Sequence, residues 1–509
     1  MSLALIVLGI VTAVELLIWL PPLWKIKKVL IVGIVPVLSL TSGLVFGWDI
    51  AAWSGLLLIF SVYRLINLLR ILDGRMSSKH LYVASRRTAW WLIGCQLFVL
   101  GGLWLSRELQ ISAMAWSYVM AGVQLAAAAL LWLSTTRTLR TTLPPTQIKS
   151  LADKELPTLS IAIPARNETE DLEECLQSLI SSDYPKLEIL VLDDCSQNKR
   201  TPGIIRDFAQ SGVRFIAGEV PPEHWLAKNY AYAQLAEEAN GELLLFCGVD
   251  TRFKPGTLRA MVEAMKAKHK TMVSFVPRNR LPSSLHIESL LVQPARYAWE
   301  IAPPRRQLER PPVLSTCWVI TAKELKRAGG FEAVSRSISP ESYFAKSAAK
   351  HGDGYSFMRA EAAIDLDSAK ILTEQRATAV RTRYPQLHRR PELVAFSGIG
   401  ELLVLIAPFG LLIGAILDHR WPLLTLSLAA ALLLISFYAR AVQLAYRRFL
   451  WRGLWTLPLA AIYDIGLLNY SMWQYEFREV IWKGRNVCVP VMRHIESAET
   501  LSAGSGKTP

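Results

Sequence analysis

The chain has 509 residues, and its 56 Lys and Arg against 42 Asp and Glu give a formal charge of +14 at pH 7. Apolar residues make up 52% of the chain and charged residues only 19%, which excludes a disordered or low-complexity protein and, with 17 Trp, indicates a membrane protein. The six cysteines include no Cys-x-x-Cys pair, so they fit neither a zinc site nor a disulfide framework and favour free thiols in a reducing compartment.

Five apolar runs open the chain, at residues 3–23, 29–46, 50–69, 89–105 and 111–133. Each approaches the ~20 residues that a helix needs to cross a bilayer. Lys and Arg gather in alternate connections between the runs, which is typical of the cytoplasmic edges of a membrane protein and not of a nucleic-acid binder. We therefore expect residues 1–140 to form a membrane domain of about five helices, with the chain entering the cytoplasm near residue 140.

Three more apolar runs, at 393–417, 422–438 and 454–473, predict two or three membrane helices within residues 391–475. Three full crossings would leave the basic segment around Lys483 outside the cell. We therefore expect the first of these runs to break at Pro408 and to be interfacial or re-entrant. Residues 476–509 are expected to hold the basic segment and a flexible tail. The prediction is a multi-pass integral protein of a bacterial plasma membrane.

Four ionisable residues lie within the apolar runs: Glu15, Arg64, Glu401 and Asp464. Such residues are costly in hydrocarbon unless they are paired. Glu15 and Arg64 are expected at similar depth, and we favour an ion pair between two helices over a role in transport.

Residues 141–390 have a sequence pattern typical of a soluble α/β domain. Short β-branched runs at 158–163 and 187–192 flank a helical run at 170–179. Strands that alternate with helices predict a Rossmann-like, mostly parallel sheet built from βαβ units. We expect this domain to lie in the cytoplasm, inserted between the two sets of membrane helices.

Polar residues follow two of the predicted strands, namely Pro164, Arg166, Asn167 and Glu168 after the first, and Asp193 and Asp194 after the second. Ligands of parallel sheets bind outside the carboxyl ends of the strands, so both clusters can converge on one ligand. A third strand leads to Asp250, a carboxylate suited to a divalent cation that neutralises a diphosphate. Lys228, between the second and third clusters, is suited to a phosphate.

Six motifs in this order resemble glycosyltransferase family 2, which has the GT-A fold. They are Pro-Ala-Arg-Asn-Glu at 164–168, Val-Leu-Asp-Asp-Cys-Ser at 191–196, Trp-x-Ala-Lys-Asn at 225–229, Val-Asp-Thr-Arg-Phe at 249–253, Gly-Gly-Phe-Glu at 329–332 and Trp-Lys-Gly-Arg at 482–485. The last resembles the ending of the membrane-bound branch, which includes ceramide glucosyltransferases and hopanoid- and carotenoid-modifying enzymes. The resemblance covers about residues 155–490.

The resemblance implies roles for individual residues. Asp193 and Asp194 would lie at the base and ribose of the nucleotide, with Glu168 nearby. Asp250 matches the second carboxylate of the D-x-D metal motif, but Gly248 replaces the first, so only half of a Mg²⁺ or Mn²⁺ site is visible. The acidic Glu-Asp pair of the family, whose Asp is the catalytic base, aligns with Pro340-Glu341, so Glu341 would be the base and Pro340 replaces the first acid.

The Q-x-x-R-W motif of the family appears as Gln386, Arg389 and Arg390, with Arg390 in place of Trp. The expected function is inverting transfer of a sugar from a nucleotide sugar, with UDP-sugars favoured, to a lipid or other membrane-associated acceptor. Glu341 would remove the acceptor proton, while Asp250 with its cation, Lys228 and the two arginines would neutralise the leaving diphosphate.

Two alternatives remain open. The departures at residues 248, 340 and 390 favour a catalytically degenerate scaffold with the same fold, and the membrane helices also fit a processive polysaccharide synthase. The sugar, the acceptor and the oligomeric state do not follow from the sequence.

Overall fold

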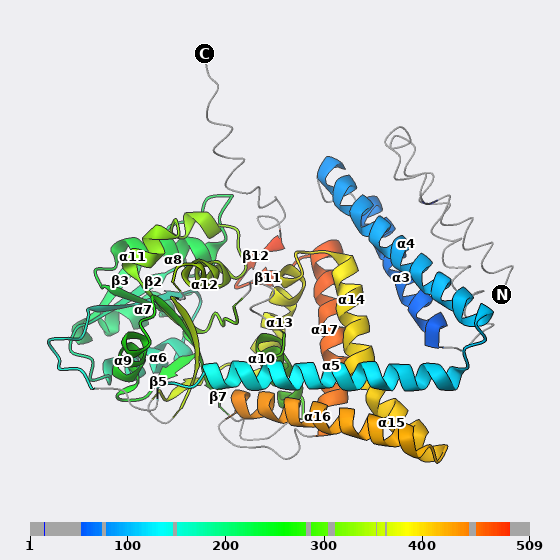
Figure 1. Ribbon diagram of the computed structural model, residues 1–509. Coiled ribbons are helices and arrows are strands. Elements are labelled where there is room, and N and C mark those ends of the chain that lie inside the picture. The colour runs from blue at the N-terminus through cyan, green and yellow to red at the C-terminus, as the bar shows by residue number, and fades with distance from the viewer. Residues whose placement is uncertain are drawn as a thin grey trace. The chain divides into compact units, whose positions relative to one another are not determined.

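The computed structural model describes Glu15 and residues 52–73, 78–145, 150–280, 287–303, 311–352, 354–361, 364–446 and 455–488. The predicted runs at 3–23 and 29–46, Glu15 excepted, and the tail beyond residue 488 lie outside these residues. The chain forms two compact units (Figure 1). One is helical and contains the described residues up to 127 with Arg383–Ala431 and Ala461–Arg478. The other contains the β-sheets and is built from residues 128–382, 432–460 and the segment from Glu479 onward.

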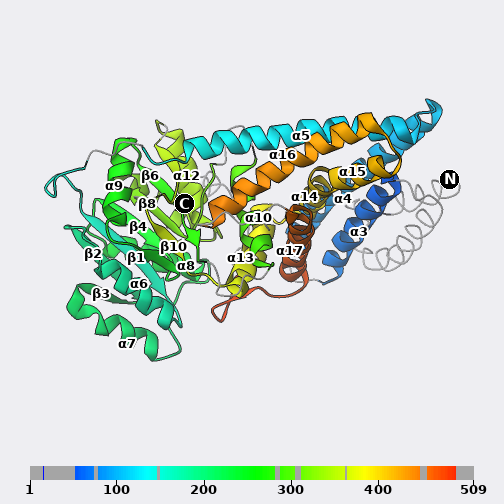
Figure 2. The same ribbon diagram turned by 90° about the horizontal axis from the view of Figure 1, so that it is seen from below.

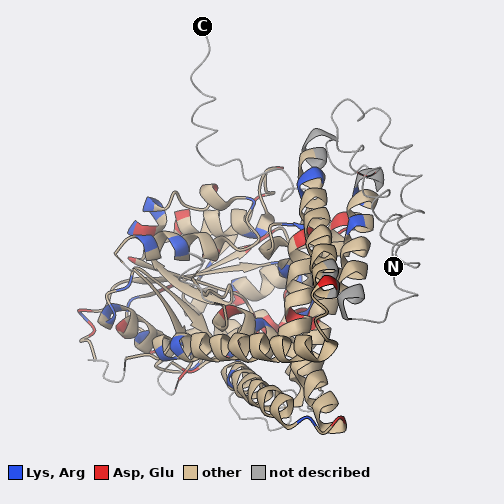
Figure 3. Ribbon diagram, turned by 45° about the vertical axis from the view of Figure 1, so that its right-hand side comes forward, with Lys and Arg blue, Asp and Glu red and all other residues tan. Residues whose placement is uncertain are grey.

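Long apolar helices dominate the first unit and continue into the second. The helices are α3 (Ala52–Asp73), α4 (Ser78–Glu108), α5 (Ala113–Thr141), α14 (Pro391–Glu401), α15 (Ala407–Leu417), α16 (Trp421–Ala445) and α17 (Leu457–Phe477). Within the described part of the chain, three helical stretches are long and apolar enough to cross a membrane, namely Ala113–Thr141, Pro391–Leu417 and Trp421–Ala445. Charged residues are sparse along them (Figure 3).

Pro408 does not break its helix. A five-residue π-helical turn, η4 (Leu402–Ile406), joins α14 directly to α15, and Pro408 lies in the first turn of α15. Proline cannot donate a backbone hydrogen bond and its ring crowds the preceding turn, and a wider π turn accommodates both effects without ending the helix. The predicted break at Pro408 is therefore wrong, because one 27-residue helical stretch runs through it.

The expected pair between Glu15 and Arg64 is confirmed. Arg64 Nε donates to Glu15 Oε2 at 2.8 Å, and both side chains are fully buried. Arg64 Nη1 also donates to Gln96 Oε1 at 2.5 Å. Asp464, another charge of the apolar runs, pairs with Arg383 within the same unit.

The second unit is built around a seven-stranded sheet of order β3-β2-β1-β4-β8-β6-β9. Its strands are β1 (Leu159–Ala165), β2 (Leu187–Asp193), β3 (Val213–Ala217), β4 (Leu243–Cys247), β6 (Met272–Val276), β8 (Cys317–Thr321) and β9 (Tyr355–Arg359). All neighbouring pairs are parallel except those that β8 makes with β4 and β6. The prediction of a mostly parallel α/β sheet is confirmed.

Helices cover both faces of this sheet (Figures 1 and 2). They are α6 (Glu170–Ile180), α7 (Arg200–Asp207), α8 (Ala227–Glu238), α9 (Thr257–Ala267), α11 (Ala322–Arg327) and α12 (Pro340–Lys350). Two further helices of the chain are α10 (Ser289–Ile301) and α13 (Leu372–Gln386). Because both faces are covered, the central strands are continuous apolar runs, and β4 is buried at every position.

An aromatic cluster packs between the sheet and α12. Phe246 of β4 stacks on Trp318 of β8 with ring centroids 4.4 Å apart, and Trp318 stacks in turn on Phe344 of α12 at 5.8 Å. These contacts fix the first turn of α12, which carries Glu341, relative to the ends of the strands.

Two small β elements complete the unit. A three-stranded sheet of order β5-β10-β7 is formed by β5 (Thr251–Phe253), β10 (Leu366–Ser368) and β7 (Arg278–Asn279). A hairpin is formed by β11 (Ile481–Trp482) and β12 (Arg485–Asn486). Lys483 and Gly484 connect its strands with φ of 49° and 77°, the two positive values of a type I′ turn.

Candidate functional site

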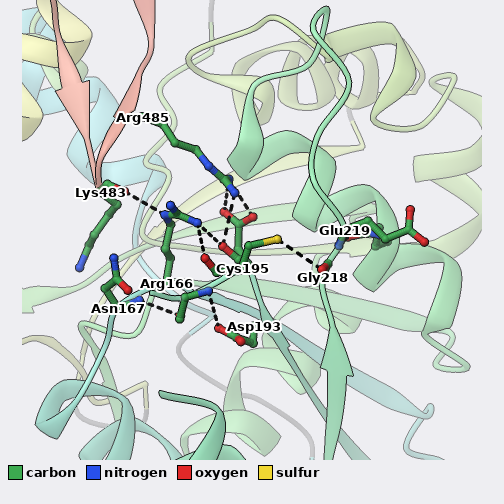
Figure 4. A network of polar contacts seen from close by, with 11 residues as sticks. Arg166, Asn167, Asp193, Cys195, Gly218, Glu219, Lys483 and Arg485 are labelled. Carbon is green, nitrogen blue, oxygen red and sulfur yellow. Dashed lines mark hydrogen bonds and ion pairs between the residues drawn. The ribbon is translucent and has the colours of Figure 1, made fainter. Parts of the chain in front are cut away.

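The loops that follow β1 and β2 are fastened to each other at the carboxyl edge of the sheet (Figure 4). Asn167 adopts a left-handed conformation with φ of 51°, and its Oδ1 accepts a hydrogen bond from Gln197 N at 2.8 Å. Asp193 Oδ1 accepts from Ser196 N at 3.2 Å. The structure therefore brings together the two clusters that the sequence places at this edge.

Arg166 connects the loops at this edge to the β11–β12 hairpin through its guanidinium. Its Nη1 donates to the carbonyl oxygens of Asp194 and Cys195 at 2.5 and 2.7 Å, and its Nε donates to the carbonyl oxygen of Lys483 at 2.8 Å. Arg166 thus joins the β1 and β2 loops to the hairpin near the end of the described chain (Figure 4). Pro164 lies within β1 itself.

The Trp-Lys-Gly-Arg hairpin supplies cations to two of the carboxylates. Lys483 Nζ lies 2.9 Å from Glu168 Oε1, and Arg485 Nη1 donates to Asp194 Oδ1 and Oδ2 at 2.8 and 2.7 Å. Burial raises the pKa of the Asp194 carboxyl, and Arg485 opposes this shift. Burial likewise raises the pKa of the Glu168 carboxyl, and the neighbouring Lys483 only partly offsets this rise. The sequence analysis used the Trp-Lys-Gly-Arg motif only for the family resemblance. It did not predict that Lys483 pairs with Glu168 or that Arg485 pairs with Asp194.

Asp250 lies just beyond β4 and is held by β10. Its backbone oxygen accepts a hydrogen bond from Ala369 N at 2.8 Å, and its Oδ2 accepts one from Ser368 Oγ at 3.3 Å. Lys370 Nζ lies 3.7 Å from the same oxygen. Burial raises the pKa of Asp250, but Lys370 and the hydrogen bonds outweigh it, so the net pKa is lowered.

The donor set around Asp250 does not fit a divalent cation. A Cβ placed on Gly248 would lie 2.4 Å from Asp250 Oδ1, so the carboxylate fills the space that a side chain at residue 248 would need. Mg²⁺ and Mn²⁺ require several oxygen or nitrogen ligands. Among the residues that the structure describes, no group of three or more His, Cys, Asp and Glu comes together to hold a metal.

Lys228 and Glu341 form a second charged group in the same unit. Burial, with the nearby Arg381 and Lys370, lowers the pKa of Lys228 to about 8, while Glu341 and Asp250 raise it. Glu341 is 4% exposed, and its Oε2 has no hydrogen-bond partner within the described ranges. Burial raises the pKa of Glu341 and Lys228 lowers it. A buried carboxylate with a raised pKa and a free oxygen is suited to accept a proton.

Arg389 and Arg390 belong to the helical unit, where each lies near a carboxylate that also pairs with a second arginine. The Arg389 guanidinium lies 4.9 Å from the ring centroid of Tyr475 and 3.7 Å from Glu476 Oε1. Arg390 Nε donates to Glu392 Oε1 at 2.7 Å. Gln386 ends α13. Binding of the donor by these three residues remains a prediction.

A known family matches part of this domain. Residues 160–321 match the model of glycosyl transferase family 2. The matched segment runs from β1 through β8 and contains the carboxylates at the strand ends, Lys228 and Asp250. Together with the sheet order, the match makes this part of the chain a GT-A-like α/β domain.

Two curated proteins with glycosyltransferase names are similar to part of the chain. The chain is 34% identical over 101 residues to the probable glycosyltransferase YdaM of Bacillus subtilis, covering 19% of this chain and 24% of that protein. It is 30% identical over 129 residues to an N-acetylglucosaminyltransferase of Rhizobium leguminosarum, covering 25% and 30%. The chain thus spans less than a third of the length of these relatives.

Solved structures resemble the chain weakly, and one of them illustrates the level of similarity. It is the mannosyltransferase PcManGT from Pyrobaculum calidifontis in complex with GDP-Man and Mn²⁺, with a TM-score of 0.43 and 18% identity over 70% of this chain and 98% of that one. Membership of the membrane-bound branch remains a prediction, because the long apolar helices of this chain lie outside the family match.

Proposed function

We propose that the chain is a membrane-bound inverting glycosyltransferase that transfers one sugar from a nucleotide sugar to a lipid or other membrane-associated acceptor. One observation carries this proposal: the Glu341 carboxylate is buried with one oxygen free, in the same α/β unit as Lys228, whose positive charge lowers the pKa of Glu341. A base for the acceptor and a cation for the leaving group are the two charges that inverting transfer needs.

In the proposed reaction the acceptor hydroxyl attacks the anomeric carbon of the sugar as its proton passes to Glu341. The bond between that carbon and the diphosphate oxygen breaks at the same time, and the electron pair stays with the nucleoside diphosphate. Lys228 stabilises the negative charge that develops on this leaving group. Asp193, Asp194 and Glu168 would contact the base and ribose from the carboxyl edge of the sheet, and UDP-sugars are the favoured donors.

The apolar helices support a membrane-associated acceptor. Three helical stretches of the described chain are long enough to cross a bilayer, by length and composition. We propose a multi-pass protein whose family 2 domain faces the cytoplasm, where nucleotide sugars are available. An amphiphilic acceptor would then present its hydroxyl at the membrane surface beside the domain.

Transfer of radiolabelled sugar to the lipid phase tests the proposal. The full chain in membranes is incubated with UDP-glucose, UDP-galactose, UDP-N-acetylglucosamine or GDP-mannose, and the lipid extract is separated by chain length. We expect one donor to label a single-sugar product, and Glu341→Gln to abolish labelling while UDP still binds. The exposed Glu237 on α8, which lies outside all six motifs, provides the matched control, since Glu237→Gln should retain activity.

Other outcomes separate the alternatives. A ladder of products would indicate a processive synthase. Full activity of Glu341→Gln would remove its role as base. If none of the donors is used and neither UDP nor GDP binds, the scaffold explanation replaces the enzyme.

A further inference from the structure

Lys370 is held beside Asp250 by backbone pairing. β10 runs antiparallel to β5, with Ser368 opposite Thr251, and Ala369 N donates to the Asp250 carbonyl oxygen at 2.8 Å. Lys370 is the next residue, and its Nζ lies 3.7 Å from Asp250 Oδ2. The contact therefore follows from the register of two strands and not from a chance approach of two flexible side chains.

Gly248 and Lys370 together change what the Asp250 carboxylate can bind. Asp250 Oδ1 lies over the Cα of Gly248, where a Cβ would approach it to 2.4 Å. Lys370 lies at the other oxygen. An ammonium beside a carboxylate repels a divalent cation, and the missing second carboxylate removes the oxygen ligand that would offset this repulsion.

The two arrangements have the same net charge. Two carboxylates with a divalent cation sum to zero, and so do the single carboxylate of Asp250 and the ammonium of Lys370. In both cases a fixed positive centre is available to a diphosphate. The side chains of Lys370 and Asp250 remain 21% and 17% exposed, so the pair can be reached by a ligand.

We propose that the Lys370 ammonium takes the place of the divalent cation and, with Lys228, binds the diphosphate of the donor, so that the chain uses its donor without a metal. This inference rests on the proposed function, because it assumes that a nucleotide sugar binds at Asp250.

The electrostatic surroundings of the two lysines agree with this role. Burial lowers the pKa of Lys370, and Arg296 and Arg381 lower it further, while Asp250 and Glu374 raise it. Lys370 in turn lowers the pKa of Lys228. Two partly desolvated ammoniums that repel each other are stabilised when an anion binds both.

Calorimetric titration of UDP into the full chain in detergent, with GDP as a second probe, tests the inference. Binding is measured after EDTA treatment and again with Mn²⁺. We expect wild-type binding to agree within about twofold between the two conditions. Lys370→Met should weaken it by about 10- to 100-fold, the range expected for loss of a charge-assisted contact. Lys370→Arg, which keeps the charge, should recover most of this loss.

Lys254 provides the matched control. It follows β5 and pairs with Asp365 at 3.1 Å, so Lys254→Met removes another lysine–aspartate pair from the same small sheet. We expect this variant to bind UDP like the wild type. A general defect of the sheet would instead weaken both variants equally, and that result would overturn the inference.

Two further outcomes are distinguishable. Wild-type binding that Mn²⁺ strengthens more than tenfold, or binding that Lys370→Met leaves unchanged, overturns the inference but keeps the proposed function. Absence of UDP and GDP binding in both conditions overturns the proposed function and the inference with it.

Discussion

Both carboxylate oxygens of Asp194 accept hydrogen bonds from Arg485 Nη1, although the two residues are 291 positions apart in the chain. The pair joins the second strand of the sheet to the hairpin that follows the last apolar helix. Asp194 is buried, so its ionised carboxylate is stabilised mainly by the Arg485 guanidinium. Arg166 holds the backbone of Asp194 in place through a hydrogen bond to its carbonyl oxygen.

Removing that guanidinium should destabilise the α/β unit. We expect Arg485→Ala to lower the free energy of unfolding by about 1–3 kcal/mol, because it leaves a buried carboxylate without its cation. Thermal unfolding in detergent measures the change. Arg214→Ala is the matched control: Arg214 pairs with Glu238 at the surface, where such pairs contribute less than about 1 kcal/mol. Equal effects of the two substitutions would contradict the prediction.

The pH dependence of kcat/KM should be bell-shaped. Glu341 must be ionised to accept a proton, and burial raises its pKa above 4.5, so activity is lost as the pH falls through that raised pKa. Lys228 must be protonated, so activity is also lost as the pH rises through about 8. Lys228→Arg should move only the alkaline limb, towards higher pH. An alkaline limb that stays in place would assign it to another group.

A metal requirement should be created by two substitutions. Gly248→Asp supplies the missing carboxylate, and the close contact it makes is with the end of the Asp250 side chain, which can rotate away. Lys370→Ala removes the competing ammonium. We expect the double variant to bind UDP at least about tenfold more tightly with Mn²⁺ than with EDTA, whereas wild type responds little. A double variant that ignores Mn²⁺ would count against the proposed equivalence of ammonium and cation.

Glu15 and Arg64 should behave as one unit. Arg64→Leu leaves a carboxylate buried without its partner, and we expect it to lower the free energy of unfolding by about 3–5 kcal/mol. Glu15→Gln in the same chain should recover part of that loss, because the buried charge is then gone. Thermal unfolding of the single and double variants measures the coupling, and strictly additive effects would contradict it.

The sheet and the convergence of two strand-end clusters could be predicted because both follow from local pattern. Parallel strands place their carboxyl ends at one edge, so residues 164–168 and 193–194 are expected to lie close together there. Lys370 carries no such signal. It follows Ser-Ala in a short strand, and it becomes significant only when that strand pairs with β5, more than 100 residues earlier.

Two other features of the structure, the contacts of the hairpin and the continuous helix through Pro408, were not predicted, for different reasons. The contacts of Lys483 and Arg485 depend on where a distant hairpin docks, and the hairpin motif does not encode its partner. Pro408 misled the sequence analysis because proline usually ends a helix. The π turn before it depends on the packing of the surrounding helix, which single-residue preferences do not describe.

The α/β unit is assembled from three separate stretches of chain, residues 128–382, 432–460 and the segment from Glu479 onward. During synthesis the first stretch leaves the ribosome well before the last, so Asp194 and Glu168 emerge long before their counterions. The carboxyl edge of the sheet can therefore acquire these ion pairs only after residues 391–477 have been made. A fragment that ends after α13 would lack Lys483 and Arg485, so the carboxylates of Asp194 and Glu168 would have no counterion from the hairpin until the whole helical unit had been synthesised.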